Sequence, residues 1–277
     1  MELTRWAVVL AGGAGVRLRG ISPDEAGLFV PKQYCALDGE PLIAAALRRA
    51  ESIAAPDRVV LVVAEEHRAF WEAAYGDDPR VVVQPHRRGL AAAALLGILA
   101  VLERDPSAHV TLVPADQSIA DEAPLFEALA AAPLDEAAIS LIGTPADYVT
   151  TDYGWLAIDA AGEARFEEKP GLVRAIELFD RGAYWSTGIA CASGAAWLSA
   201  FEAALPTWVE ALTAAFDCAP GPYRELVLEN RFDALEAVEL SPLFEVAPLR
   251  AILTELDSWA DLESPRALAP YLDRIAG

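Results

Sequence analysis

The stretch WAVVLAGGAGVRL, residues 6–18, joins a short apolar run to a glycine-rich turn. Residues 6–10 have the composition of a buried strand. Gly12, Gly13 and Gly15 let the main chain turn tightly and approach a ligand closely, because glycine has no Cβ atom. The N–H groups of such a turn can donate to phosphate oxygens or to a base. The stretch therefore predicts a nucleotide-binding loop at the carboxyl end of a strand.

Two familiar phosphate-binding turns do not fit this loop. The dinucleotide-binding turn requires a third glycine at the position that Leu18 occupies, and the Walker A turn requires a Gly-Lys-Ser or Gly-Lys-Thr string that does not follow. What remains is a loop that covers a triphosphate, with Arg17 neutralising its outer phosphates.

Away from this loop, apolar runs alternate with amphipathic stretches through the first half of the chain. Such apolar runs are typical of parallel strands buried on both faces, and the stretches between them have helical spacing. We therefore expect an α/β fold with a mostly parallel sheet, helices on both of its faces and a binding crevice at the carboxyl ends of the strands. The predicted strands are residues 6–10, 59–63, 81–83, 109–113 and 139–142, and the predicted helices are residues 41–53, 65–75, 90–102 and 124–131.

The second half carries shorter predicted elements that belong to the same sheet. No linker rich in Pro, Gly or Ser and no internal repeat separates the halves, so we predict one domain over residues 1–277. The predicted strands here are residues 154–158, 165–168, 188–191, 234–239 and 251–255, and the predicted helices are residues 194–204, 207–218 and 265–275.

The composition excludes several classes of protein. A net charge of −21 repels polyanions, so no nucleic-acid partner is expected. No apolar run reaches membrane-spanning length and the first residues lack a secretory signal, so we expect a cytoplasmic protein without a membrane partner. Three cysteines and three histidines are dispersed along the chain, which predicts neither disulfides nor a zinc site.

Only two lysines occur among the 277 residues, Lys32 in FVPKQY and Lys169 in FEEKP. All other basic side chains are arginines apart from the histidines, so lysine at these two positions suggests that a compact ammonium group is required there. A lysine-poor composition would explain the scarcity but not the positions.

The strings LAGGAGVRL, residues 10–18, and VPKQYCALDGEPL, residues 30–42, resemble the signature of sugar-1-phosphate nucleotidylyltransferases. The PKQ string is most similar to mannose-1-phosphate guanylyltransferases. Such enzymes join an NTP to a sugar 1-phosphate and release pyrophosphate. The resemblance implies a three-layer αβα, Rossmann-like (GT-A-like) fold with a mostly parallel mixed central sheet. It assigns nucleotide binding to Leu10, Gly12, Gly13 and Gly15, and catalysis to Arg17 and Lys32.

Further strings match the family in chain order. QPHRRGLAAAA, residues 84–94, is similar to the turn that holds the nucleobase, which implies base contacts by Gln84 and Gly89. Three more strings are similar to the segments that bind the sugar and its phosphate. They are TDYGWLAI, residues 151–158, RFEEKP, residues 165–170, and YWSTGIACA, residues 184–192, and they imply contacts by Gly154, Glu168, Lys169 and Ser186.

Two strings match those that carry the metal ligands of the family. LVPADQSI, residues 112–119, provides Asp116, and LDSWADLESP, residues 256–265, provides Asp261. Magnesium prefers one or two carboxylates together with phosphate oxygens, so Mg²⁺ is the expected cofactor. The resemblance thus divides the domain into a nucleotide-binding half, a sugar-phosphate half and a C-terminal helix, which are residues 1–120, 121–265 and 266–277.

The chain departs from the guanylyltransferase pattern at Leu90, Gln117, Ser186 and Glu263. Leu90 gives a GLA string that is more like the thymidylyl and uridylyl enzymes. The favoured substrates are GTP and mannose 1-phosphate, and three alternatives stay open. They are a thymidylyl or uridylyltransferase acting on glucose 1-phosphate, a cytidylyltransferase acting on methylerythritol phosphate, and a non-catalytic regulatory homologue that binds sugar nucleotides. The sequence leaves the oligomeric state open, with a homodimer as one option.

Overall fold

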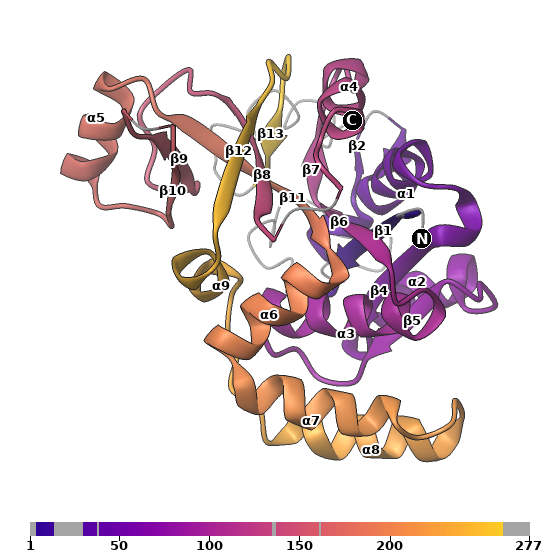
Figure 1. The fold of residues 1–277 in the computed structure, drawn as a ribbon. Coiled ribbons are helices and arrows are strands. Elements are labelled where there is room, and N and C mark those ends of the chain that lie inside the picture. The colour runs from indigo at the N-terminus through magenta and orange to yellow at the C-terminus, as the bar shows by residue number, and fades with distance from the viewer. Residues whose placement is uncertain (1–3, 14–29, 38, 135–136, 161, 263–277) are drawn as a thin grey trace.

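A computed structural model of the chain describes residues 4–13, 30–37, 39–134, 137–160 and 162–262. Its centre is a nine-stranded mixed sheet (Figure 1). The strands of this sheet are β1 (Thr4–Ala11), β4 (Val59–Ala64), β5 (Val81–Gln84), β6 (Ala108–Pro114), β8 (Ile139–Pro145), β9 (Trp155–Ile158), β10 (Ala164–Glu167), β11 (Tyr184–Ser193) and β12 (Leu249–Leu253).

The main path through the sheet runs β10-β9-β11-β6-β1-β4-β5, with β8 paired to both β11 and β12. Strands β6, β1, β4 and β5 form a parallel block, and β12 is parallel to β8. Strand β11 is antiparallel to β6, β8 and β9 and joins the parallel block to the rest of the sheet. The end of β6 therefore lies beside the irregular part of β11, between Ser186 and Ala190, and the end of β1 lies on the other side of β6.

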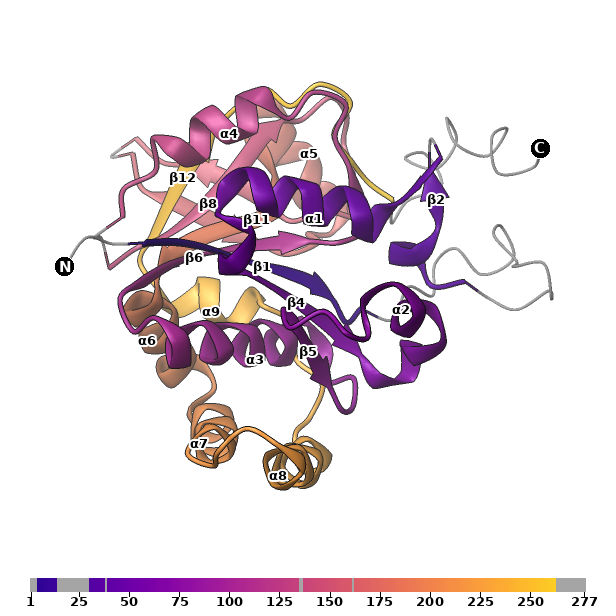
Figure 2. The same ribbon diagram turned by 90° about the vertical axis from the view of Figure 1, so that its right-hand side faces the viewer.

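Helices cover both faces of the sheet (Figure 2). Helices α1 and α4 lie on one face, whereas α3, α6 and α9 lie on the other, and α7 and α8 form a further layer outside α3. The α-helices are α1 (Leu42–Ile53), α2 (Arg68–Tyr75), α3 (Gly89–Arg104), α4 (Ala123–Ala130), α5 (Leu172–Asp180), α6 (Gly194–Ala204), α7 (Pro206–Phe216), α8 (Pro222–Asp233) and α9 (Ser241–Val246).

Three short helices and two small strand pairs complete the described elements. The short helices are η2 (Lys32–Tyr34), η3 (Pro56–Arg58) and η4 (Glu65–His67), and the pairs are β2 (Ala36–Leu37) with β3 (Glu40–Pro41) and β7 (Gln117–Ser118) with β13 (Ala260–Asp261). The predicted α/β class, a mixed sheet between helices, is confirmed. One large apolar core combines β1 and α3 with residues of α6, α7, α8 and α9.

The predicted strand at residues 234–239 is wrong, because this segment has no strand structure. Its main chain bonds to the start of α3 instead: the Val238 N–H donates to the Arg88 carbonyl at 3.0 Å, and the Val238 carbonyl accepts from the Ala91 N–H at 3.1 Å. Helices α5, α8 and α9 were not predicted. The helix predicted at residues 265–275 lies outside the described residues.

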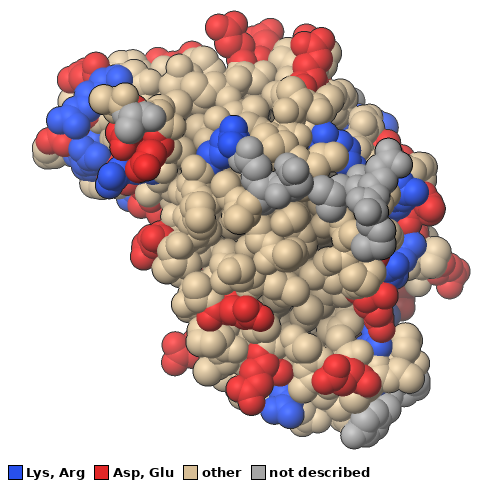
Figure 3. Space-filling view, in the orientation of Figure 1, with Lys and Arg blue, Asp and Glu red and all other residues tan. Residues whose placement is uncertain are grey.

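The surface face drawn in Figure 3 has charged side chains of both signs around a largely uncharged centre. Acidic side chains predominate at its lower edge, over α7 and α8. Among the described helices, none combines the length and the hydropathy that a membrane span requires.

Candidate functional site

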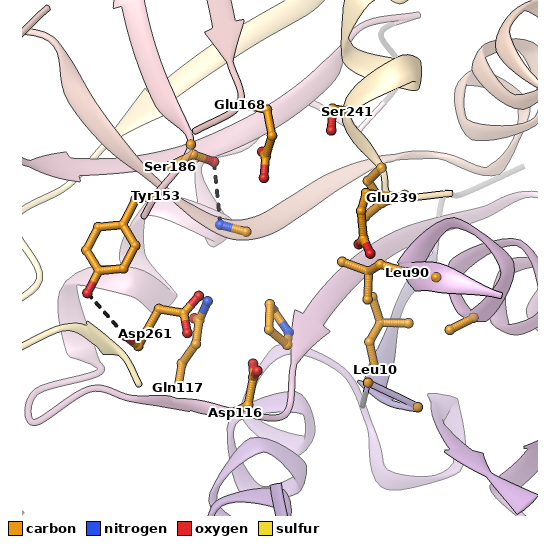
Figure 4. A pocket seen from close by; sticks show the side chains of 18 of the residues that line it. Leu10, Leu90, Asp116, Gln117, Tyr153, Glu168, Ser186, Glu239, Ser241 and Asp261 are labelled. Atoms are coloured by element: carbon orange, nitrogen blue, oxygen red, sulfur yellow. Dashed lines mark hydrogen bonds between the residues drawn. The ribbon is translucent and has the colours of Figure 1, made fainter. Parts of the chain in front are cut away.

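A cavity of about 980 Å³ opens at the carboxyl ends of β1 and β6 and extends to β10 and β11. Figure 4 shows that the carboxylates of Asp116 and Asp261 lie on one side, Leu10 and Leu90 on another, and Glu168 and Ser186 across the opening. The cavity brings together most of the residues predicted from the sequence. Those that line it are Leu10, Gly12, Gly13, Lys32, Gly89, Asp116, Gly154, Glu168, Lys169, Ser186 and Asp261.

Lys32 lies between the two aspartates. Its Nζ atom is 3.0 Å from Asp116 Oδ2 and 2.6 Å from Asp261 Oδ1. The lysine is 2% exposed, while the aspartate side chains are 36% and 22% exposed and face the cavity. Burial alone would lower the pKa of Lys32, but the two carboxylates outweigh it and raise the pKa well above its ordinary value. Lys32 therefore stays protonated and carries a positive charge at the wall of the cavity.

Strand pairing brings Asp261 to Asp116, although the two residues are distant in the chain. Asp261 of β13 pairs with Gln117 of β7, the residue that follows Asp116. The Tyr153 hydroxyl donates to the Asp261 carbonyl at 3.1 Å, which holds this strand from the other side. The position of the second carboxylate thus depends on main-chain contacts.

Gln117, one of the departures noted in the sequence, has a structural role next to these carboxylates. Its Nε2 donates to the Thr187 carbonyl of β11, and its Oε1 accepts from Trp259 Nε1 at 3.2 Å. The amide therefore connects three segments of the site, and its donor and acceptor are both used. A glutamine fits this position because it provides one donor group and one acceptor group.

Gln33 connects the glycine-rich turn to the lysine segment. Its Nε2 donates to the carbonyls of Ala11 at 2.8 Å and Gly13 at 3.0 Å. The main chain at the end of β1 is therefore held against η2, next to Lys32. Gly15 and Arg17, predicted to bind and neutralise the triphosphate, lie outside the described residues.

The start of α3 closes the end of the cavity near Leu10 and Leu90. Gly89 has φ +81°, and a Cβ atom there would come within 2.1 Å of the Val238 carbonyl oxygen. Only glycine fits such a position, so the segment around Val238 can cap this helix. One N–H group at the start of α3 is therefore already used, because the Val238 carbonyl accepts from the Ala91 N–H.

Gln84, predicted to contact the base, is not part of the cavity lining. Its Nε2 donates to the His86 carbonyl at 2.8 Å, and its buried Oε1 has no hydrogen-bond partner. That oxygen is 2.7 Å from the position that a Cβ atom on Gly12 would take. The Gln84 amide thus occupies the space next to the Gly12 Cα atom, and a side chain at residue 12 would collide with it.

At the opposite end of the cavity, Gly154 permits the close approach of two side chains. A Cβ atom there would lie 2.6 Å from the Phe166 ring and 3.4 Å from Glu168 Oε2. The Gly154 carbonyl accepts the Ser186 N–H at 2.8 Å, which ties the segment before β9 to β11. Ser186 in turn accepts from the Gly188 N–H at 3.5 Å, and its hydroxyl faces the cavity.

Lys169 is 38% exposed at this end, and its Nζ lies 3.7 Å from Glu168 Oε1. Its φ of +41° places a non-glycine residue in the left-handed region. Lysine rarely adopts this conformation, which costs on the order of 1–3 kcal/mol and is found most often at functional sites.

Several residues that line the cavity were not predicted from the sequence. Glu239 and Ser241 come from the segment before α9 and from its first residue, and Figure 4 places both between Glu168 and Leu90. No motif marked them, because the pattern of residues 234–239 predicted a strand. Glu66 and Arg87 form an ion pair at the cavity, although no sequence motif gave Arg87 a role.

The two aspartates fit a magnesium ion in type and number. Among the described residues, no group of three or more His, Cys, Asp and Glu side chains could hold a metal ion. Mg²⁺ does not need such a group, because it commonly takes one or two carboxylates and completes its octahedron with water and phosphate oxygens. Asp116 and Asp261 already share one cation, the Lys32 ammonium.

Comparisons with known proteins found curated relatives of this chain. The chain is 28% identical over 197 residues to the alginate biosynthesis protein AlgA of Pseudomonas fluorescens, and 30% identical over 200 residues to AlgA of Pseudomonas syringae pv. tomato. Each alignment covers 66% of this chain and 40% of the relative, so the matched region spans two fifths of these curated proteins.

Among solved structures, a mannose-1-phosphate geranyltransferase from Thermus thermophilus is similar, with a TM-score of 0.81 and 26% identity. That alignment covers 99% of this chain and 80% of the other. A mannose-6-phosphate isomerase from Helicobacter pylori shares the fold, with a TM-score of 0.74, 19% identity and coverage of 94% and 100%. The model of the nucleotidyl transferase family matches residues 6–195, more than half of the chain. The chain therefore belongs to the nucleotidyl transferase family and has its three-layer, Rossmann-like fold.

Proposed function

We propose that this chain transfers a nucleoside monophosphate from an NTP to a sugar 1-phosphate, releasing pyrophosphate and forming an NDP-sugar. The favoured substrates are GTP and mannose 1-phosphate. The observation that carries the proposal is that Lys32, Asp116, Lys169 and Asp261 all line one cavity of about 980 Å³ in a member of this family. A cavity of this size accommodates two substrates of this class side by side.

The proposed reaction needs positioning and positive charge more than proton transfer. An oxygen of the sugar phosphate forms a bond to the α-phosphorus of the NTP, and the bond from that phosphorus to the bridging oxygen of pyrophosphate breaks. No general base is required, because the attacking oxygen is already anionic. The barrier comes mainly from bringing two anions together in line, and fixed cations lower it.

The side chains divide this task by position. Lys32 neutralises the attacked phosphate, and Lys169 at the other end of the cavity neutralises the incoming sugar phosphate. Glu168 and Ser186 offer oxygen atoms to the sugar hydroxyls. The described part of the glycine turn, residues 12–13, lines the same cavity and is assigned to the nucleotide. Arg17 of the same turn is assigned the leaving pyrophosphate.

Asp116 and Asp261 are the residues that would hold Mg²⁺. When bound, the ion would supply further positive charge to the reacting phosphates. The net charge of −21 makes these local charges necessary, because the rest of the chain repels both substrates.

Similarity supports the choice of substrates. The structure from Thermus thermophilus, which matches 99% of this chain, is named for mannose 1-phosphate. The PKQ string of residues 31–33 is the one most similar to guanylyltransferases. Leu90, which lines the cavity, is more like the residue of thymidylyl and uridylyl enzymes and therefore favours thymine or uracil over guanine. The experiment must for this reason include dTTP and UTP as well as GTP.

A grid of reactions tests the proposal. GTP, dTTP, UTP, CTP and ATP are each combined with the 1-phosphates of mannose, glucose, galactose and glucosamine, and pyrophosphate is measured with and without Mg²⁺. We expect the highest kcat/KM for GTP with mannose 1-phosphate and a requirement for the metal. Binding of nucleotides without pyrophosphate release in any combination would establish a non-catalytic homologue instead.

A pair of variants tests the assignment of the carboxylates. Asp261→Asn should lower kcat by about 10²-fold or more, as expected for the loss of one preorganised charge at a reacting phosphate. Asp257→Asn is the matched control, because Asp257 precedes β13 by a few residues and is exposed. Equal activity of the two variants would remove Asp261 from the site.

A further inference from the structure

The cation between the two aspartates is part of the chain itself. Lys32 Nζ touches one oxygen of each carboxylate, at 3.0 and 2.6 Å, so the two acidic groups converge on a single nitrogen atom. These are the same two carboxylates that the proposed function gives to Mg²⁺. One position therefore has two candidate occupants, the ammonium group and the divalent ion.

Charge explains why an ammonium group lies between the two aspartates. Two carboxylates held close together by the β7–β13 pairing repel each other, and the repulsion is strong at a partly buried site of low dielectric constant. Lys32 is 2% exposed, so its ammonium group lacks most of its hydration and depends on these carboxylates for compensation. The ammonium group and the two carboxylates therefore stabilise each other.

The same contacts oppose the binding of a metal ion. A divalent cation that enters between the aspartates meets a fixed unit of positive charge within a few ångströms and competes for the same oxygen atoms. An incoming triphosphate changes this balance, because its oxygens offer the ammonium group another anion. A lysine side chain can follow such a change, since it is a flexible stem with a compact charge.

We infer that Lys32 acts as an internal counter-ion that reserves the metal position in the substrate-free enzyme and releases the two aspartates when a nucleotide phosphate is present. This inference rests on the metal role of Asp116 and Asp261 in the proposed function. It assigns Lys32 a second task besides contact with the attacked phosphate. Binding of the divalent ion to the chain is then coupled to binding of the nucleotide.

The test is Mn²⁺ binding to the nucleotide-free protein, with unbound Mn²⁺ measured by electron paramagnetic resonance. Lys32→Met removes the charge and keeps an unbranched apolar stem, so the variant should bind Mn²⁺ at least about 10-fold more tightly than wild type. Lys169→Met is the matched control. It removes the other lysine of the same cavity, which lies beside Glu168 and not beside the aspartates, and it should leave Mn²⁺ affinity unchanged.

Thermal unfolding provides a second readout that does not require a fully stable variant. Without metal, Lys32→Met and Lys32→Gln should unfold at lower temperature than wild type, because the two carboxylates lose their counter-ion. Added Mn²⁺ should raise the Tm of both variants and leave the Tm of wild type nearly unchanged. Recovery of a folded variant only in the presence of Mn²⁺ would support the inference in the same way.

Two outcomes would overturn the inference. One is Mn²⁺ affinity in Lys32→Met equal to or lower than that of wild type, and the other is an equal effect of Mn²⁺ on the Tm of wild type and variants. Neither outcome depends on turnover. Conversely, absence of pyrophosphate release in the substrate grid would remove the proposed function and leave the Mn²⁺ measurement valid.

Discussion

Lys169 is strained in the main chain and holds an ammonium group at the cavity. Its φ of +41° is unfavourable for a residue with a Cβ atom, and the residue precedes Pro170, which restricts its conformation further. The strain would be relieved by glycine, yet the chain has lysine. The role that the proposed function gives to the ammonium group would explain why lysine occupies this position.

Two substitutions separate the strain from the charge. Lys169→Gly and Lys169→Ala both remove the ammonium group, and both should raise the KM for the sugar 1-phosphate by about 10-fold or more, the value of one charge-assisted hydrogen bond. The KM for the NTP should change much less. Lys169→Gly should also be more stable than Lys169→Ala by about 1 kcal/mol in urea unfolding, because alanine keeps the left-handed strain. Equal KM effects on both substrates would contradict the role of Lys169, and a less stable glycine variant would contradict the strain.

At the scale of elements, helix α3 shows how closely the layers pack. Its sequence, GLAAAALLGILAVLER, is apolar on almost every side, as expected for a helix between a sheet and other helices. It packs on β1 and β4 with one side and on α6 and α7 with the other. Gly97 lets the helix approach the sheet closely, since a Cβ atom there would lie 2.4 Å from Val8 Cγ1 and 2.9 Å from Val62 Cγ2.

Gly97→Ala should therefore destabilise the protein, although alanine is the better helix former. Overpacking costs about 1–3 kcal/mol and the gain in helix propensity is about 1 kcal/mol, so the net loss is at most about 2 kcal/mol. The contact of 2.4 Å places this site at the upper end of the overpacking cost, and we expect a net loss close to that limit. Urea unfolding measures it. Ser199→Ala is the control on the exposed side of α6 and should be nearly neutral. A Gly97→Ala protein as stable as wild type would show that α3 can move away from β1 and β4 without loss of free energy of unfolding.

The whole molecule carries an excess of negative charge that ion pairs cannot remove. The chain has 42 acidic and 21 basic side chains, so 21 carboxylates stay unbalanced even if every lysine and arginine forms one pair. Surface ion pairs contribute little by themselves, and the excess charge repels itself throughout the folded chain.

Salt should therefore stabilise this protein. Raising the ionic strength from about 0.01 M to about 0.15 M shortens the Debye length from about 30 Å to about 8 Å and screens this repulsion. We expect the Tm to rise by about 2–4 °C, the shift that about 1 kcal/mol produces in a chain of this size. Sodium chloride and choline chloride should act alike in a thermal scan. A Tm that falls with salt would show that the stabilisation by local ion pairs is larger than the destabilisation by the net charge.

The sequence predicted the elements whose pattern is local. Strands β1, β4, β6 and β8 lie inside the sheet, β5 is the last strand of its described path, and all five are visible as continuous apolar runs. Helix α8 was missed because its sequence, PYRELVLENRFD, has little net hydrophobicity, and its place depends on contact with α7. Residues 234–239 have the composition of a strand, but Val238 pairs with the start of α3 and the N–H groups of residues 234 and 235 donate to the end of α8. Local composition does not encode which partner a main-chain segment finds.

The candidate site also combines features that the sequence shows locally with contacts that only the folded chain forms. By itself the sequence determined the resemblance to the family and the candidate side chains for the chemistry, because strings such as PKQ and EKP place rare lysines and carboxylates in a recognisable order. Only the tertiary structure decided that Lys32 lies between Asp116 and Asp261, that Gln84 stands behind Gly12, and that Glu239 faces the cavity. The physical reason is that these contacts form between segments distant in the chain. Their geometry follows from strand pairing and packing of the whole sheet, and spacing along the sequence does not contain it.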